Sequence, residues 1–66
     1  MSNLMEGLLE EMNRNRELLV QYAAIGPAGT LGAVLISQDI ATAERAIADD
    51  DVVAMLRVYE ALKNNE

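Results

Sequence analysis

Residues 18–38 read LLVQYAAIGPAGTLGAVLISQ, an unbroken run without a charged side chain, and Gly26 and Pro27 stand near its middle. Gly26 can adopt the left-handed backbone conformation that ends many helices. Pro27 lacks the N–H that would continue the helical hydrogen bonds, although it suits the first turn of a new helix. The stretch therefore predicts the end of one helix, a turn and the start of a second helix.

The same stretch is long enough to raise the question of a membrane span. Polar residues such as Gln21 and Thr30 dilute it, and Gly-Pro at its centre would break a spanning helix where lipid offers no replacement hydrogen bonds. The preceding sequence, MSNLMEGLLEEMNRNRE, has no basic start and is interrupted by glutamates, unlike a signal peptide. We therefore predict no membrane contact and a cytoplasmic location.

Before the turn, apolar residues recur every three or four positions, as on one face of an amphipathic helix over residues 3–25. Ser2 or Asn3 is its expected N-cap, and Glu10 is expected to pair with Arg14 one turn later. Written as a heptad, the apolar seam runs through Met5, Leu8, Met12, Asn15, Leu19 and Tyr22.

Asn15 is the one polar residue in this seam. A buried Asn can fix the register of a helical partner, as in coiled coils. The simpler interpretation, which we favour, is an Asn at a partly open position that binds water.

After the turn, a second helix is predicted over residues 29–48, apolar almost all round in its first half, and a shorter third helix over 51–63. The Asp49–Asp51 triplet supplies an N-cap and negative charge at the start of the third helix. The residues KNNE at 63–66 are expected to fray into solvent. The predicted fold is all-α and a single domain, 1–66: two long antiparallel helices joined by a Gly-Pro turn, plus a shorter third helix, completed as an oligomeric helical bundle.

Composition excludes several classes of function. The chain has no Cys and no His, which removes disulfides, thiolate or imidazole metal sites and the commonest catalytic groups. The aspartate triplet lacks the looped spacing of a calcium site. The net charge of −6, with only five scattered basic residues, argues against direct nucleic-acid binding. We predict no catalytic residues, cofactor or metal, and interpret the acidity as an aid to solubility; mimicry of nucleic acid toward a basic protein is a less favoured alternative.

Small size combined with 52% hydrophobic residues predicts self-association, because a chain of 66 residues can bury only part of that apolar surface alone. We expect the first helix and the apolar first half of the second to make a homo-oligomer contact. The predicted interface residues are Met5, Leu8, Leu9, Met12, Asn15, Leu19, Tyr22, Leu31, Val34 and Leu35.

The glycine-rich turn leaves two interpretations open. Its glycines can serve only to turn the chain and pack two helices closely, which we favour. Alternatively, the free N–H groups at a helix start can bind a small anionic, nucleotide-like ligand. The candidate ligand-binding residues are Gly26, Ala28, Gly29, Thr30 and Gly32.

Two segments, RELLVQYAAIGPAGTLGAVLI at 16–36 and AERAIADDDVVAMLRVYEALK at 43–63, resemble the small, acidic, cysteine-free helical proteins encoded by bacteriophages and prophages. The resemblance is one of style and length and carries no diagnostic motif. It implies a non-enzymatic accessory protein that binds a host protein, or a homo-oligomer that sequesters a small signalling molecule.

Overall fold

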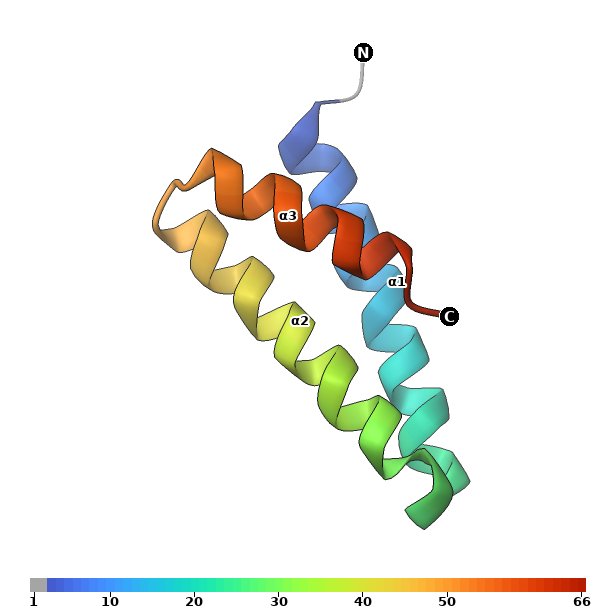
Figure 1. Cartoon of the computed structure of the whole chain (residues 1–66). Helices are drawn as coiled ribbons and strands as arrows, with labels where there is room; N and C mark the ends of the chain where they lie inside the picture. The colour runs from blue at the N-terminus through green and yellow to red at the C-terminus, as the bar shows by residue number, and fades with distance from the viewer. Residues whose placement is uncertain (1–2) are drawn as a thin grey trace.

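The computed structural model describes residues 3–66, in which α1 spans Leu4–Ile25, α2 spans Thr30–Ala48 and α3 spans Val52–Lys63 (Figure 1). A short 3-10 turn, η1, covers Pro27–Gly29 between α1 and α2. The predicted all-helical fold of three packed helices is confirmed. Each observed helix begins one residue after its predicted start and ends where predicted.

The helix ends follow local chemistry. The Asn3 side chain accepts a hydrogen bond from the Glu6 N–H at 2.8 Å and caps α1; Ser2, the other candidate cap, lies outside the described residues. Asp51 caps α3 in the same way, accepting from the Ala54 N–H at 3.1 Å, as predicted. Gly26 has the expected positive φ of 87°, but its ψ of −147° lies outside the left-handed helical region, in a region that only glycine adopts readily.

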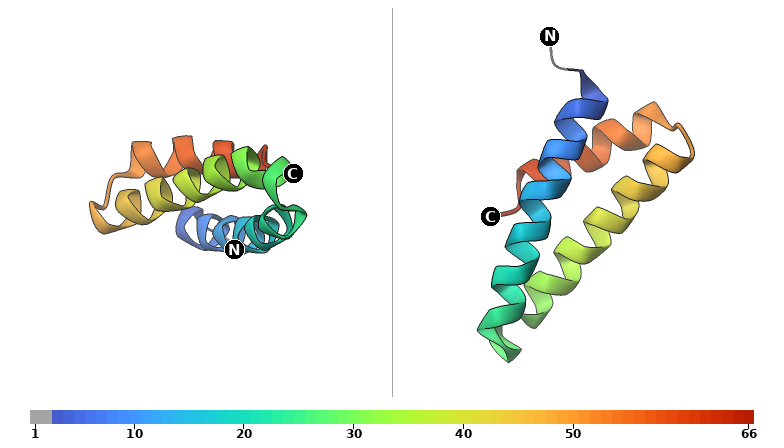
Figure 2. Two further views of the ribbon diagram at one scale, coloured as in Figure 1. Left: turned by 90° about the horizontal axis from the view of Figure 1, so that it is seen from below. Right: turned by 180° about the vertical axis from the view of Figure 1, so that it is seen from behind.

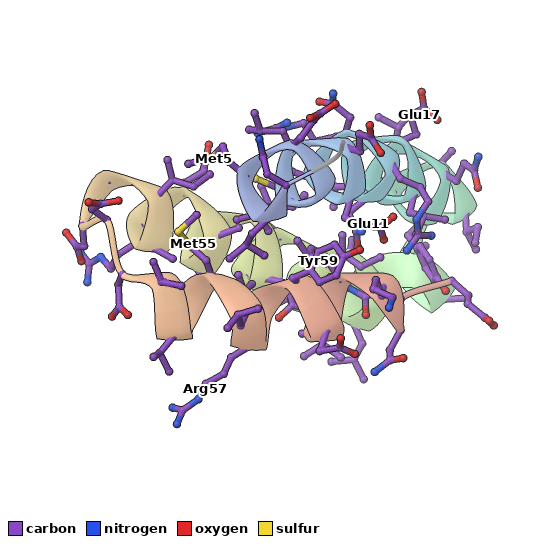
Figure 3. All side chains as sticks on the ribbon, turned by 90° about the horizontal axis from the view of Figure 1, so that it is seen from above. Met5, Glu11, Glu17, Met55, Arg57 and Tyr59 are labelled. Carbon is purple, nitrogen blue, oxygen red and sulfur yellow. The ribbon has the colours of Figure 1, made fainter. Side chains whose placement is uncertain are left out.

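α1 and α2 form an antiparallel hairpin, and α3 lies across one side of it (Figure 2). Contacts place α3 over the N-terminal half of α1, because the Tyr59 ring meets Gly7 and lies between α1 and α3 (Figure 3). Further along, the Leu62 carbonyl reaches Asn15. The turn end of the hairpin therefore extends beyond the part that α3 covers.

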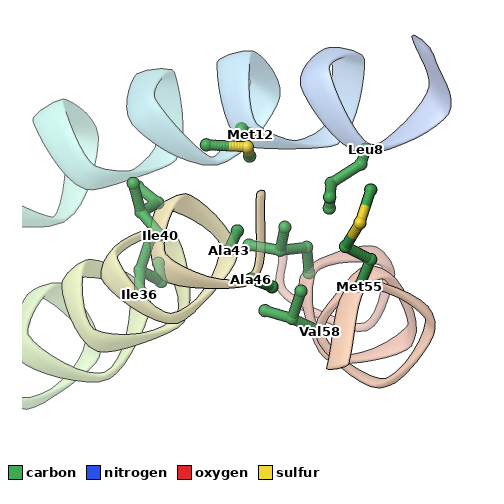
Figure 4. Packing of buried hydrophobic residues seen from close by; sticks show 9 residues of the cluster. Leu8, Met12, Ile36, Ile40, Ala43, Ala46, Met55 and Val58 are labelled. Carbon is green, nitrogen blue, oxygen red and sulfur yellow. The ribbon is translucent and has the colours of Figure 1, made fainter. Parts of the chain in front are cut away.

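The core forms where the three helices meet (Figure 4). α1 contributes Leu8 and Met12, α2 contributes two isoleucines and two alanines, and α3 contributes three apolar residues. These buried residues are Leu8, Met12, Ile36, Ile40, Ala43, Ala46, Met55, Val58 and Leu62. The heptad seam of α1 thus packs against the helices of its own chain.

Six of the ten residues predicted for the subunit interface are instead buried or partly buried within the chain. Leu8, Met12 and Asn15 are buried within the chain and are not available at its surface. Met5, Leu19 and Tyr22 are partly buried against the same core. Leu9, Leu31, Val34 and Leu35 remain exposed large hydrophobic residues.

In the part of the chain that the structure describes, no helix is both long enough and apolar enough to cross a bilayer.

Candidate interaction surface

The turn end of the hairpin is the main uncharged region of the molecule. We call residues 18–38 the hairpin tip; all 11 acidic and all 5 basic residues of the chain lie outside this range. Among the described residues, five of the nine exposed large hydrophobic side chains belong to it, with Leu31 70% exposed and Ile25 61% exposed. These five are Val20, Ile25, Leu31, Val34 and Leu35. Leu31, Val34 and Leu35 stand three and four positions apart and share one face of α2, and an uncharged apolar face of this kind is typical of a site for another macromolecule.

Leu31 and Leu35 lie one helical turn apart and therefore share a face of α2. A cavity of about 320 Å³ opens beside Leu35. Its hairpin side is formed by Tyr22, Gly32, Leu35 and Ile36, and its other side by residues 64–66. We call this space the tip cavity.

The tip glycines bring α2 close to Tyr22. A Cβ on Gly29 would stand 2.0 Å from the Tyr22 carbonyl oxygen, and a Cβ on Gly32 would stand 2.7 Å from the Tyr22 ring. Both distances are far shorter than van der Waals contact, so only glycine permits this approach. Gly29 and Gly32 thus have a packing role within the hairpin.

The candidate ligand-binding residues have few polar groups to offer an anion. Gly29 is buried and its N–H donates to the Gly26 carbonyl at 2.9 Å. The Thr30 hydroxyl donates weakly to the same carbonyl at 3.4 Å. Ala28 is exposed, and the hairpin tip contains no Lys or Arg. Anion binding at this turn stays a prediction.

Residues 64–66, which we call the clasp segment, hold the end of α3 against the hairpin. The Asn65 side-chain amide donates to Asn15 Oδ1 at 2.9 Å and to Asp39 Oδ2 at 3.0 Å. The Tyr22 hydroxyl donates to the Glu66 carbonyl. The expectation that residues 63–66 fray is therefore wrong for Asn65 and Glu66, because these residues find partners on α1 and α2.

Arg14 and Asn15 are the α1 side of this polar cluster. Arg14 donates to the Leu62 carbonyl at 2.7 Å and the Asn65 carbonyl at 2.9 Å, and its ion pair is with Glu11 at 3.0 Å. The predicted pair with Glu10 is thus replaced by one with Glu11, which leaves the guanidinium directed at the last carbonyls of α3. Such a contact also suits the negative end of the helix dipole.

Asn15 is fully buried, so the favoured interpretation of a partly open, water-bound Asn is wrong. Its amide donates to the Glu11 carbonyl at 2.8 Å and the Leu62 carbonyl at 3.1 Å, and its oxygen accepts from Asn65. All hydrogen-bonding atoms of this side chain therefore find partners within the chain. Asn15 fixes the position of α3 on α1, a registry role inside one chain.

A second, wider cavity of about 470 Å³ lies along α2 and α3. Its polar lining comes from Asp39, Thr42, Asp51 and Arg57. Asp39 and Asp51 are already engaged as acceptors from Asn65 and from the Ala54 N–H. Across residues 3–66, no group of three His, Cys, Asp or Glu residues is arranged to hold a metal ion. Asp51 here caps α3 and Asp39 holds Asn65, whereas Arg57 is exposed.

Two groups of residues at this site were not predicted from the sequence. Val20 and Ile25 belong to the exposed tip surface, and a signal was present, since both are aliphatic in an uncharged stretch. Asn65 carried no signal in the sequence, because its partners lie on two other helices.

Comparison with known proteins finds no matching family model, no similar curated protein and no similar solved structure.

Proposed function

We propose that the chain is a small non-enzymatic interaction protein that forms a homo-oligomer through its hairpin tip. One observation carries the proposal: the five exposed aliphatic side chains of the tip lie in the stretch that has no charge. None of the five side chains belongs to the buried core of the single chain. Their burial against another protein would be favourable, with about 1.5–3 kcal/mol for a fully buried Leu or Ile and less for one already half-buried.

Charge restricts where a second copy of the chain can make contact. Each copy has a net charge of −6, and like charges oppose contacts between the charged parts of two copies. A contact between two tips brings together the uncharged parts and leaves the charged residues on the outside. Among residues 3–66, Glu66 in the clasp segment is the one charged residue that borders the tip cavity.

The oligomer would present its acidic outer surfaces to a further partner. By the resemblance to phage and prophage accessory proteins, that partner would be a host protein. A basic surface on the partner would complement the negative charge and speed association. The hairpin tip, in contrast, offers no charge for such a partner to recognise.

Sedimentation velocity over a range of micromolar concentrations tests the proposal. We expect the wild-type chain to sediment as a dimer or larger species. Leu35→Asp should abolish that species without unfolding the chain, because Leu35 is 52% exposed in the single chain. Leu56→Asp is the matched control, since Leu56 is 51% exposed on α3, outside the tip, and its variant should associate like wild type. A folded wild-type monomer at every concentration would refute the proposal.

A further inference from the structure

The tip cavity has an apolar wall and a polar wall. Tyr22, Gly32, Leu35 and Ile36 line it on the hairpin side, and residues 64–66 line it on the opposite side. Gly32 leaves the space beside the Tyr22 ring free, because a Cβ at this position would stand 2.7 Å from the ring. The cavity therefore suits a molecule that has both an apolar body and a polar group.

The polar wall is negatively charged. Among residues 3–66, Glu66 is the one charged residue that lines the cavity, and Asn64 adds an exposed side-chain amide. Arg14 reaches the Asn65 carbonyl, but its charge is offset by the ion pair with Glu11 at 3.0 Å. The hairpin tip has no Lys or Arg, and the whole chain has a net charge of −6. The cavity therefore attracts cations and repels anions.

The aromatic ring on the apolar wall also suits a cation. The face of a tyrosine ring attracts an ammonium group that lies within about 6 Å of the ring centroid. Lys63 makes such a contact elsewhere in the same chain, with its Nζ 5.2 Å from the centroid of the Tyr59 ring. At the cavity, the Tyr22 hydroxyl is bound to the Glu66 carbonyl, so the aromatic residue and the acidic residue stand on facing walls of one space.

The volume of the cavity sets the size of the molecule. About 320 Å³ lies at the lower end of the range for ligand sites, roughly 300–1,000 Å³. At about 30 Å³ for each water, this space holds about ten waters, and a ligand of about ten to fifteen non-hydrogen atoms fills it. One protruding side chain of a docked protein would leave most of the space empty.

We propose that the tip cavity binds a small organic cation, namely an amine with an aromatic or aliphatic body. The body lies against Tyr22, Leu35 and Ile36, and the ammonium group lies near Glu66 and the side-chain oxygen of Asn64. All these residues belong to one chain, so the inference goes beyond the proposed self-association and does not depend on it.

Three probes of nearly equal size and different charge test the proposal. At neutral pH, 2-phenylethylamine is cationic, 2-phenylethanol is neutral and phenylacetate is anionic. Each is titrated into the isotope-labelled wild-type chain, and the backbone amide signals are followed by NMR. We expect the amine to shift the signals of Gly32, Leu35 and Asn65 with a Kd of about 1 mM or lower, the alcohol to bind more weakly and phenylacetate not to bind.

Two variants separate the charge from the apolar wall. Glu66→Gln removes the carboxylate and should weaken binding of the amine about fivefold, the upper range for an exposed ion pair, while leaving binding of the alcohol unchanged. Glu10→Gln is the matched control, because it changes the net charge equally at an exposed position that does not line the cavity. Leu35→Trp fills the space and should abolish binding of both probes, whereas Leu31→Trp, one helical turn away and outside the lining, should not. Far-UV circular dichroism first shows that each variant is folded, and Leu35→Phe replaces Leu35→Trp if the latter is not.

Several results would overturn the inference. If the amine shifts no signal of the lining residues at the limit of its solubility, the cavity has no such ligand. If phenylacetate or the alcohol binds as tightly as the amine, or if Glu66→Gln and Glu10→Gln bind the amine equally, the cavity does not select a cation. If a lysine-containing peptide shifts these signals and the amine does not, the site belongs to a protein partner. None of these results bears on self-association, which sedimentation of the wild-type chain without a probe decides.

Discussion

Replacing Asn15 with Ala tests the polar cluster that joins α3 to the hairpin. The substitution removes three hydrogen bonds, to the Glu11 carbonyl, to the Leu62 carbonyl and from the Asn65 amide. At about 0.5–1.5 kcal/mol each, their loss should lower the free energy of unfolding by about 3 kcal/mol. The Leu62 carbonyl keeps its bond from Arg14 and the Asn65 amide keeps its bond to Asp39, so neither is left unsatisfied.

That loss is large for so small a protein. A chain of 66 residues has a total stability of roughly 3–10 kcal/mol, and the midpoint of thermal unfolding should fall by about 12–24 °C. Urea unfolding followed by circular dichroism measures the change, at one fixed protein concentration because association adds stability. Asn13→Ala is the matched control: Asn13 is exposed on the same helix, and its replacement should change the stability by no more than about 0.5 kcal/mol. Equal stabilities for the two variants would refute the reasoning.

Three further predictions concern the turn, a helix cap and the charge. Gly29→Ala should destabilise the fold by about 3 kcal/mol or more, because its Cβ would overlap the backbone of Tyr22; thermal unfolding measures this, and a loss no larger than that of Gly7→Ala, whose Cβ would make an ordinary 3.4 Å contact with the Tyr59 ring, would contradict it. Asp51→Ala should cost about 1 kcal/mol through the lost cap of α3, measured by urea unfolding against Asp49→Ala, and an equal effect of both would argue against capping. Self-association measured by sedimentation should strengthen with added sodium chloride, since salt screens repulsion between chains of net charge −6, and weakening by salt would indicate an ionic contact.

The sequence predicts the helices well because their signals are local. Gly26 and Pro27 mark the turn, Asn3 and Asp51 mark the helix starts, and the three-and-four spacing of apolar residues marks the buried faces. Each of these features depends on neighbours within a few positions. Local chemistry therefore determines where each helix begins and ends.

Which helix packs against each buried face cannot be read from the neighbouring sequence. The seam through Leu8 and Met12 is equally compatible with a second chain and with the chain's own α2 and α3. Asn15 shows the same limit: its partners Leu62 and Asn65 are about 50 positions away along the sequence, and the spacing of apolar residues gives no sign of them. The uncharged stretch at 18–38 is plain in the sequence, but which of its apolar residues stay exposed depends on where α3 ends.

Sedimentation velocity of the wild-type chain beside Leu35→Asp and Leu56→Asp decides whether the hairpin tip is the surface of self-association. We expect a dimer or larger species for wild type and Leu56→Asp, and a folded monomer for Leu35→Asp. A wild-type chain that remains a folded monomer at every micromolar concentration, or a Leu35→Asp variant that associates as tightly as Leu56→Asp, would contradict it.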